Sequence, residues 1–387
     1  MNYTLMKVVI APDKFKNSLT GEDFCNAVEA GFLAKNSGVE ILKLPLADGG
    51  DGTIDVVNYY LKGSKVKLVV NNPFFEAVEA SYLYAENTKT AFIEMAEASG
   101  VKLLKPKQFD CKNASTFGTG ELIEDALNKG AKHIILGIGG SATNDCGVGM
   151  ATALGYRFFN DNNQEVEPIG ANLSEIKKIC VLKAHPRLQT VKFSVACDVT
   201  NPLYGKNGAA YVYAAQKGAT KQDIKMLDKG LQDFAKHLEA TFKINVQSIE
   251  GAGAAGGMGI ASKLFLKGEL IPGIELIKNL ADFNTKIAKA DWIITGEGKL
   301  DTQTMSGKTI QGVLTSAKAK NIKVAAFCGA VDLSKNDINT MGITYVDAVI
   351  AKAKSLEDAM QNSYNYVREI AETFALSLFS SKTTRLK

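Results

Sequence analysis

A stretch of nine residues, 251–259, contains five glycines and restricts the fold more than any other segment of this chain. Its sequence is GAGAAGGMG, and a helix-like run over 260–266 follows it directly. A glycine inside a helix costs roughly 1 kcal/mol relative to alanine, so an ordinary helix or strand is not expected here. Glycine-rich backbone that opens into a helix is typical of anion-binding loops, because its N–H groups and the positive helix end can face a phosphate.

A second glycine-rich stretch, GIGGSATND at 137–145, follows a strand-like run at 132–136 and precedes a helix-like run at 149–154. Two such loops in one chain favour a protein that handles phosphate groups. We predict that one of these loops binds phosphate through its backbone and side-chain groups. The candidate residues are Gly139, Gly140, Ser141, Thr143 and Asn144 in one loop, and Gly253, Gly256 and Gly257 in the other.

Composition limits the class of protein. The chain has 387 residues, 46% of them hydrophobic, and a net charge of +4, which is too small to indicate a nucleic-acid partner. Only four residues are arginines, so anion binding falls to lysines, backbone N–H groups and a metal. Six scattered cysteines without a CxxC pair argue against a disulfide framework or structural zinc. With no long apolar run and no signal-peptide pattern, we expect a cytoplasmic protein without a membrane partner.

Apolar strands alternate with amphipathic helices at both ends of the chain, which predicts a parallel sheet covered on both faces. The expected strands there are 7–11, 39–44, 292–295, 324–328 and 347–350, and the expected helices are 20–34, 53–61, 309–320 and 356–378. In the middle, strands at 65–70, 78–84 and 90–94 follow one another without helices. We predict an α/β fold in which a doubly wound domain, 1–75 plus 285–387, carries an inserted mixed α/β domain, 76–284.

Several expected strands are followed at once by small residues, a carboxylate and often a lysine. Ligands bind at the carboxyl ends of strands in open α/β sheets, so these side chains are candidate site residues. They are Asp13 and Lys16 in APDKFKNS, Asp48 in ADGGDGT, Asp198 in CDVTNPL, Lys217 in QKG, and Glu297, Lys299 and Asp301 in TGEGKLD. The plainer alternatives are helix caps at Ser18, Thr20, Asp51 or Thr53, an Asx turn before Pro202, and a surface position for Lys217.

The glycine loops also match the dinucleotide pattern GxGxxG or its GxGxxA variant, which raises a nicotinamide-dependent dehydrogenase as an alternative. That pattern needs a further strand ending in an acidic residue about 20 positions on. Glu269 is near that distance, but 267–272 is a poor candidate strand. A P-loop is excluded because Gly307-Lys308-Thr309 would need a glycine where Thr302 stands. A non-catalytic sugar- or nucleotide-sensing protein is the other alternative.

Taken together and in this order, the motifs closely resemble the bacterial glycerate kinase family, type 1. The matching segments are APDKFKNS at 11–18, PLADGGDGT at 45–53, GIGGSATND at 137–145, CDVTNPL at 197–203, QKGA at 216–219, GAGAAGGMG at 251–259 and TGEGKLD at 295–301. The resemblance covers nearly the whole chain from Met6, and residues 1–5 are expected to be a short extension. It implies ATP-dependent phosphorylation of D-glycerate with Mg²⁺ in organic-acid catabolism, with 2-phosphoglycerate the favoured product. It also implies a flavodoxin-like domain with an inserted one.

The chain departs from the family pattern at several motif positions. Lys14 and Asn17 replace a usual serine and glycine, Asp51 a glutamate, Cys146 a glycine, Ala214-Ala215 a glycine-proline, and Lys299 an arginine. The last change matters most, since lysine is a point charge and lacks the planar fork of arginine. A bidentate contact at position 299 is therefore not expected.

Phosphoryl transfer needs carboxylates for magnesium, positive groups for phosphates and one group that orients the acceptor hydroxyl. From residue type and placement we expect Asp198 to orient that hydroxyl, with Lys16 and Asp48 as further catalytic residues. Asp13, Lys217, Lys299 and Asp301 are expected to bind substrate, with the glycerate carboxylate on Lys16, Lys217 or Lys299, and Asp198 and Glu297 to bind the metal. The sequence leaves open which glycine loop holds the ATP phosphates and whether the chain forms a homodimer.

Overall fold

The computed structural model describes residues 6–49, 52–302, 304 and 309–383. Within it the chain divides into two compact units, residues 1–60 with 274–387 and residues 61–273. Both boundaries lie earlier in the chain than the expected junctions after 75 and 284. The reason for the first is that Ser64–Asn71 pairs along its whole length with Ala77–Ala85, so residues 64–75 belong with the strands that follow them.

The first unit is built on a five-stranded sheet in which every strand is parallel to its neighbours. Its order is β15-β13-β11-β1-β2, which is the flavodoxin-like order. The strands are β1 (Lys7–Ile10), β2 (Glu40–Lys43), β11 (Trp292–Thr295), β13 (Lys323–Cys328) and β15 (Tyr345–Ala348), with the small pair β12 (Lys299–Leu300) and β14 (Ala330–Val331) beside them. The predicted doubly wound parallel sheet is confirmed.

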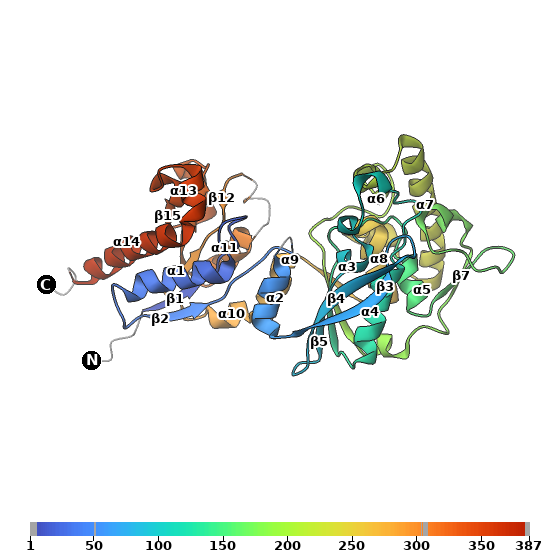
Figure 1. Ribbon diagram of the computed structural model, residues 1–387, viewed down its shortest axis with the longest axis horizontal. Helices are drawn as coiled ribbons and strands as arrows, with labels where there is room; N and C mark the ends of the chain where they lie inside the picture. The colour runs from blue at the N-terminus through green and yellow to red at the C-terminus, as the bar shows by residue number, and fades with distance from the viewer. Residues whose placement is uncertain (1–5, 50–51, 303, 305–308, 384–387) are drawn as a thin grey trace. The chain divides into compact units, whose positions relative to one another are not determined.

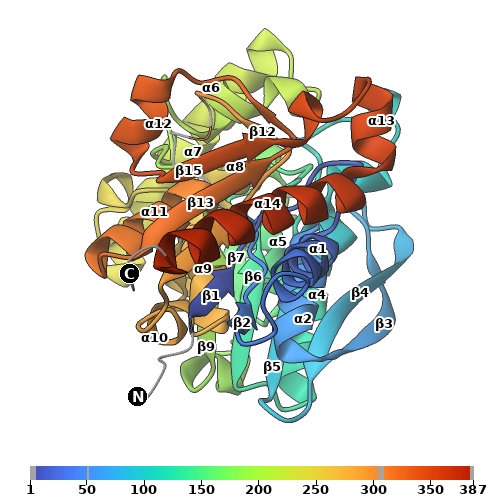
Figure 2. The ribbon, with the colours of Figure 1, turned by 90° about the vertical axis from the view of Figure 1, so that its left-hand side faces the viewer.

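Helices cover this sheet. They are α1 (Gly21–Leu33), α2 (Thr53–Leu61), α9 (Gly273–Leu280), α10 (Phe283–Lys286), α11 (Thr309–Ala319), α12 (Lys335–Met341), α13 (Leu356–Gln361) and α14 (Ser363–Thr383), with the 3-10 turn η8 (Val349–Ala351). α1 packs on α14, and α11 contacts β11 and β13 (Figure 1). Phe374 of α14 contacts Trp292, Phe327 and Tyr345 on three neighbouring strands. These aromatic contacts fix α14 over the sheet, where Figure 2 shows it beside β13 and β15.

The expected single helix over 356–378 is wrong, because the chain breaks at Asn362 into α13 and α14. Asn362 leaves helical geometry, and its side-chain amide donates to Asp358 Oδ1 at 2.8 Å. Asparagine side chains offer the backbone such local alternatives to a continuous helix. The break makes α13 a separate short helix that follows η8 in the chain. Figure 2 shows α13 apart from α14.

The second unit contains a six-stranded mixed sheet in the order β10-β9-β6-β5-β4-β3. The hairpin β3–β4 and the pair β4–β5 are antiparallel, whereas β5, β6, β9 and β10 are parallel. The strands are β3 (Ser64–Asn71), β4 (Ala77–Ala85), β5 (Thr90–Glu94), β6 (His133–Gly137), β9 (Lys192–Ala196) and β10 (Glu269–Ile271), with the separate antiparallel pair β7 (Arg157–Phe159) and β8 (Lys178–Cys180). The expectation that 267–272 is a poor strand is wrong, since pairing with β9 supplies the strand that local propensity does not indicate.

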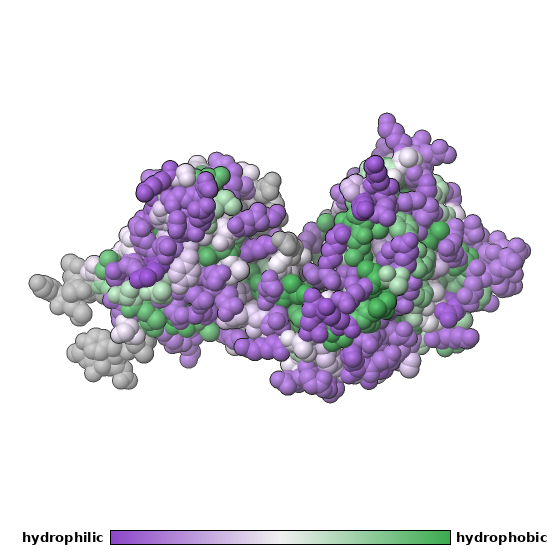
Figure 3. Space-filling view, in the orientation of Figure 1, coloured by the Kyte–Doolittle hydropathy of each residue, from purple (hydrophilic) through white to green (hydrophobic). Residues whose placement is uncertain are grey.

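Helices of the second unit bury apolar stripes on one large core. They are α3 (Ala96–Ser99), α4 (Phe117–Asn128), α5 (Val148–Ala153), α6 (Ala209–Tyr213), α7 (Lys221–Phe242) and α8 (Ala254–Phe265), and the 3-10 turns are η1 (Val101–Leu103), η2 (Pro106–Gln108), η3 (Gly170–Glu175), η4 (Pro186–Gln189), η5 (Ala215–Lys217) and η6 (Val246–Ser248). In α7 the buried residues Leu227, Leu231, Phe234 and Leu238 recur at helical spacing. Its other face is hydrophilic, as is the loop after β7 (Figure 3).

Helix α1 approaches α14 closely at Gly31. A Cβ atom at Gly31 would lie 2.6 Å from both the Cβ of Ala371 and the carbonyl oxygen of Arg368. We predict that Gly31→Val lowers the free energy of unfolding by about 1–3 kcal/mol through overpacking. Chemical denaturation measures this, with Ala30→Val on the same helix as the matched control. Equal losses in the two variants would show that the close approach has no energetic consequence.

Candidate active site

Three of the predicted carboxylates follow the carboxyl ends of β1, β2 and β11 in the first unit. In this order, β2 lies on one side of β1 and β11 lies on the other, so the sheet has a topological switch point between β1 and β11. Ligands of open α/β sheets bind at such a switch point. Asp13 follows β1, Asp48 follows β2 and Glu297 follows β11. All three carboxylates line one cavity of about 500 Å³. The predicted candidates of three separate motifs therefore meet in one place.

Lysines line the same cavity. They are Lys14, Lys16 and Lys299. Lys299 also forms ion pairs with Asp332 Oδ2 at 2.9 Å and Asp301 Oδ2 at 3.8 Å. Asp301 thus lies beside Lys299. The described residues that line the cavity do not include Asp301. Lys14 was not predicted as a site residue, although it stands in the same motif as Asp13 and Lys16.

Both carboxylate oxygens of Asp13 accept hydrogen bonds within the first unit. Its Oδ1 accepts a hydrogen bond from the Lys14 N–H at 2.7 Å, and its Oδ2 accepts one from the Thr309 hydroxyl. Burial raises the pKa of Asp13, the nearby Asp48 carboxylate raises it further, and the Thr309 bond opposes the rise. A cation bound between Asp13 and Asp48 would be stabilising, because it would offset the repulsion between their negative charges. Thr309 was not predicted as a site residue, because nothing in the local sequence connects it to a motif 296 residues earlier.

Glu297 is held by a different hydroxyl. Its Oε1 accepts a hydrogen bond from Thr304 Oγ1 at 2.5 Å, and the Asp301 backbone N–H donates to the same Thr304 oxygen at 3.2 Å. The hydroxyl therefore fixes the Glu297 carboxylate at the cavity wall. The predicted segment Gly50–Asp51 and the pair Gly307-Lys308 lie outside the described residues.

In the second unit, the loop after β6 exposes backbone to solvent. Gly139 and Gly140 are exposed, and a Cβ atom at Gly139 would have no heavy atom within 4 Å. Gly140 has a positive φ of 71°, a conformation that glycine adopts without strain. This part of the predicted phosphate loop is thus open to a ligand.

The following residues of that loop turn inward. Thr143 and Asn144 are fully buried, and their side-chain polar atoms have no hydrogen-bond partner among the described residues. The neighbouring Asp145 carboxylate is also buried and accepts hydrogen bonds from the Thr116 N–H at 2.8 Å and the Thr116 hydroxyl at 2.7 Å. In this structure Thr143 and Asn144 are therefore not accessible to a ligand from solvent.

The glycines of the other loop are required for close packing. A Cβ atom at Gly253 would lie 2.2 Å from the Pro202 carbonyl oxygen, and one at Gly256 would lie 2.3 Å from that of Thr143. Gly257 has a φ of 93°, and its Cβ would lie 2.8 Å from Cys146 Cα. The loop is buried between segments 143–147 and 197–202. Close backbone packing is a reason for glycine at these positions that does not involve phosphate, and their contact with phosphate stays a prediction.

In the GAGAAG stretch, the dinucleotide pattern lacks its structural context. The GAGAAG stretch follows the 3-10 turn η6, whereas the dinucleotide pattern requires a strand before the glycines. Residues Ala255, Gly256 and Gly257 have left-handed backbone conformations, so α8 does not begin as a regular helix. The positive end of a straight helix is therefore not presented at this loop.

Lys217 is buried beneath the exposed loop, so the alternative of a surface lysine is wrong. Only 5% of the residue is exposed. Its Nζ donates hydrogen bonds to Ser141 Oγ at 2.6 Å and to the Thr143 carbonyl at 2.9 Å. Burial lowers the pKa of Lys217 to about 8, against the opposing effects of Cys111 and Asp145. Lys217 holds the loop from inside.

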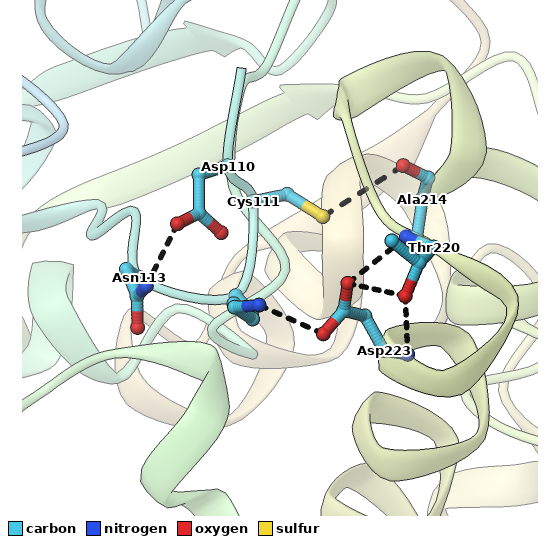
Figure 4. A network of polar contacts seen from close by, with 7 residues as sticks. Asp110, Cys111, Asn113, Ala214, Thr220 and Asp223 are labelled. Carbon is cyan, nitrogen blue, oxygen red and sulfur yellow. Dashed lines mark hydrogen bonds and ion pairs between the residues drawn. The ribbon is translucent and has the colours of Figure 1, made fainter. Parts of the chain in front are cut away.

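A polar network fixes the segment that carries Lys217 (Figure 4). Asp223 forms a capping box with Thr220 and an ion pair with Lys112 at 2.8 Å. The Cys111 N–H donates to the Lys217 carbonyl at 3.2 Å, and the Cys111 thiol contacts the Ala214 carbonyl. Segment 111–112 thus connects the carbonyls of Ala214 and Lys217 to the start of α7.

Asp198 lies at the carboxyl end of β9, as predicted, and is exposed. Its Oδ1 accepts a hydrogen bond from the Gly273 N–H at 2.8 Å, which orients the carboxylate. Asp198 belongs to the second unit, whereas Glu297, its predicted partner in metal binding, belongs to the first.

The low pKa of Lys217 predicts a pH-dependent stability. Between the folded pKa of about 8 and the ordinary value of 10.5, the unfolded chain holds a proton that the folded chain lacks, so stability rises with pH. We predict that the free energy of unfolding of the natural chain gains about 2 kcal/mol relative to Lys217→Met from pH 7 to pH 9.5. Denaturant titrations at both pH values measure this difference. A constant difference would contradict the depressed pKa.

Comparisons with known proteins agree with each other. Residues 8–378 match the family model described as the Glycerate kinase family. The chain is 41% identical over 377 residues to a glycerate kinase of Halalkalibacterium halodurans, which covers 97% of this chain and 99% of the relative. It is 38% identical to glycerate 2-kinase of Escherichia coli, over 96% of this chain and 99% of that protein. A crystal structure from Salmonella typhimurium LT2, described as a glycerate kinase 2, superposes with a TM-score of 0.88 at 39% identity, covering 98% of this chain and 100% of that one.

Proposed function

Because the chain belongs to the glycerate kinase family and is a kinase, we propose that it transfers the γ-phosphoryl group of ATP to the 2-hydroxyl of D-glycerate. The observation that carries this proposal is the cavity at the switch point of the first unit, which collects three carboxylates and three lysines. Phosphoryl transfer depends on such charged groups for positioning and charge neutralisation. The name of the Escherichia coli relative, glycerate 2-kinase, supports the 2-hydroxyl as acceptor.

Magnesium fits the carboxylates of this cavity. Within the described part of the chain, no three His, Cys, Asp or Glu side chains are grouped so that they could hold a metal ion alone. Magnesium at nucleotide sites typically takes one or two carboxylates together with phosphate oxygens and water. Asp13, Asp48 and Glu297 supply oxygen ligands of that kind. When bound there, Mg²⁺ would neutralise charge that develops on the transferring group.

The residues of this chain then act by holding and orienting. In the first unit, lysine ammonium groups bind negatively charged oxygens, and the Thr309 and Thr304 hydroxyls keep Asp13 and Glu297 in place. In the second unit, the exposed backbone at Gly139 and Gly140 binds an anionic group of one of the two substrates. Asp198 accepts the proton of the acceptor hydroxyl, and Gly273 fixes its orientation.

The proposed setting is the cytoplasm, in the catabolism of organic acids. All six cysteines are free thiols, as expected in a reducing compartment. No helix in the described part of the chain has the length and apolar character needed to cross a membrane.

The reaction itself is tested by a coupled ADP-release assay. We predict turnover only when ATP, Mg²⁺ and D-glycerate are all present, with a phosphorus NMR spectrum that matches 2-phosphoglycerate. A spectrum of 3-phosphoglycerate would contradict the proposed acceptor hydroxyl. Failure to release ADP with D-glycerate, while another hydroxy acid supports turnover, would contradict the proposed substrate.

Asp198 has a matched control in the same unit. Asp198 Oδ1 accepts from the Gly273 N–H at 2.8 Å, and Asp228 Oδ1 accepts from the Gly205 N–H at 2.7 Å. We predict that Asp198→Asn lowers kcat by about 100-fold or more, because the hydroxyl loses its proton acceptor. Asp228→Asn should leave kcat within about twofold of the natural chain, by the same assay. Similar kcat values for both variants would remove Asp198 from the mechanism.

A further inference from the structure

One wall of the cavity in the first unit is apolar and contains none of the charged residues described above. Beyond the lysines and carboxylates, it is lined by Val349 and Ile350 of η8 and by Leu356, Ala359 and Met360 of α13. Three of these side chains are unusually exposed for large hydrophobic residues: Ile350 at 38%, Leu356 at 68% and Met360 at 38%. Exposed apolar residues that gather on one cavity wall indicate a ligand with an apolar surface.

Hydrogen bonds connect this apolar wall to the charged loop after β1. Ser18 Oγ donates to the Met360 carbonyl at 3.0 Å, and the Ser363 hydroxyl donates to the Ser18 carbonyl at 3.5 Å. The Ile350 N–H donates to the Gly329 carbonyl at 2.9 Å. Gly329 directly precedes β14, which pairs with β12, the strand that carries Lys299. The two halves of the cavity are therefore joined into one surface within this unit.

Glycerate does not account for this lining. It is a three-carbon acid with two hydroxyl groups and a single negative charge, and it has no apolar surface for a wall of five hydrophobic residues. A cavity of about 500 Å³ is also in the range that holds a drug-sized ligand. Of the two proposed substrates, the nucleoside triphosphate combines a flat apolar ring with a strongly charged tail.

The charge pattern favours the same substrate. The charged end offers carboxylates at Asp13, Asp48 and Glu297 together with three lysines. A ligand with one carboxylate and no metal would pair with the lysines and leave the three acidic groups without a positive partner. A magnesium–triphosphate complex presents both signs of charge, because the metal faces carboxylates and the phosphate oxygens face lysines.

We propose that this cavity is the ATP site, with the adenine ring on the wall formed by Ile350, Leu356 and Met360 and the triphosphate at Lys14, Lys16 and Lys299. The inference rests on the proposed function and moves the ATP phosphates from the glycine loops to the first unit. The exposed backbone at Gly139 and Gly140, with Asp198, is left to bind the acceptor acid.

The test compares ligands with and without the base. In the double variant Leu356→Asn, Met360→Gln, we expect the KM for ATP and the inhibition constant of ADP to rise about tenfold, because the ring loses its apolar support. The inhibition constant of inorganic tripolyphosphate, which has no base, and the KM for D-glycerate should stay within about twofold. The matched control is Leu376→Asn on α14, where the leucine is 50% exposed and does not line the cavity.

Unchanged ADP inhibition in the double variant would overturn the proposal, as would a rise confined to the KM for D-glycerate. Equal weakening of ADP and tripolyphosphate would also overturn it, since the wall would then act on the phosphates. Failure of the proposed function gives a different result, because ATP-dependent turnover of D-glycerate would then be absent from the natural chain. In that case calorimetric titration with Mg²⁺ and ADP still measures whether the double variant weakens nucleotide binding.

Discussion

The parallel pairing of β1 with both β2 and β11 is the constraint on which the charged end of the cavity depends. Since all three strands run in one direction, their carboxyl ends open at one edge of the sheet. The residues that follow them must then share a small space, although Asp13 and Glu297 are far apart in sequence. The Asp13 N–H donates to the Gly296 carbonyl at 2.8 Å, which brings these two loops together. Burial raises the pKa of Asp13, and the nearby Asp48 carboxylate adds to that rise, which prepares the site for a cation.

In the second unit, the charged side chains that hold the loop after β6 are buried. Lys217 contacts its loop from below, and the buried Asp145 carboxylate connects the same loop to the start of α4. A buried lysine with a pKa near 8 is costly to charge, so its hydrogen bonds to Ser141 and to the Thr143 carbonyl matter for the shape of the loop. The glycines at 256 and 257 complete this arrangement by letting two backbones approach without a Cβ between them. The exposed Gly139 and Gly140 are thus presented by a rigid support.

The strand ends that carry Asp13, Asp48, Asp198 and Glu297 were predictable, because continuous apolar runs followed by glycine and carboxylate indicate them locally. The burial of Lys217 and the hydrogen bond from Thr309 to Asp13 were not, since both depend on segments that only the tertiary fold brings together. The 251–259 glycines illustrate the same limit. Their conformational freedom was correctly inferred, but sequence alone does not distinguish a loop that holds a ligand from one that holds another loop. The apolar wall was hidden because α13 was expected to be part of one long helix.

In the proposed ATP site, the adenine ring lies on the wall formed by Ile350, Leu356 and Met360. Photolabelling with an ATP analogue that carries an azide on the adenine ring, followed by peptide mapping, tests this placement. We expect labelled peptides within residues 349–363, and loss of that label when excess ATP and Mg²⁺ are present. Label concentrated in the loop at 137–145, with residues 349–363 unmodified, would contradict the placement.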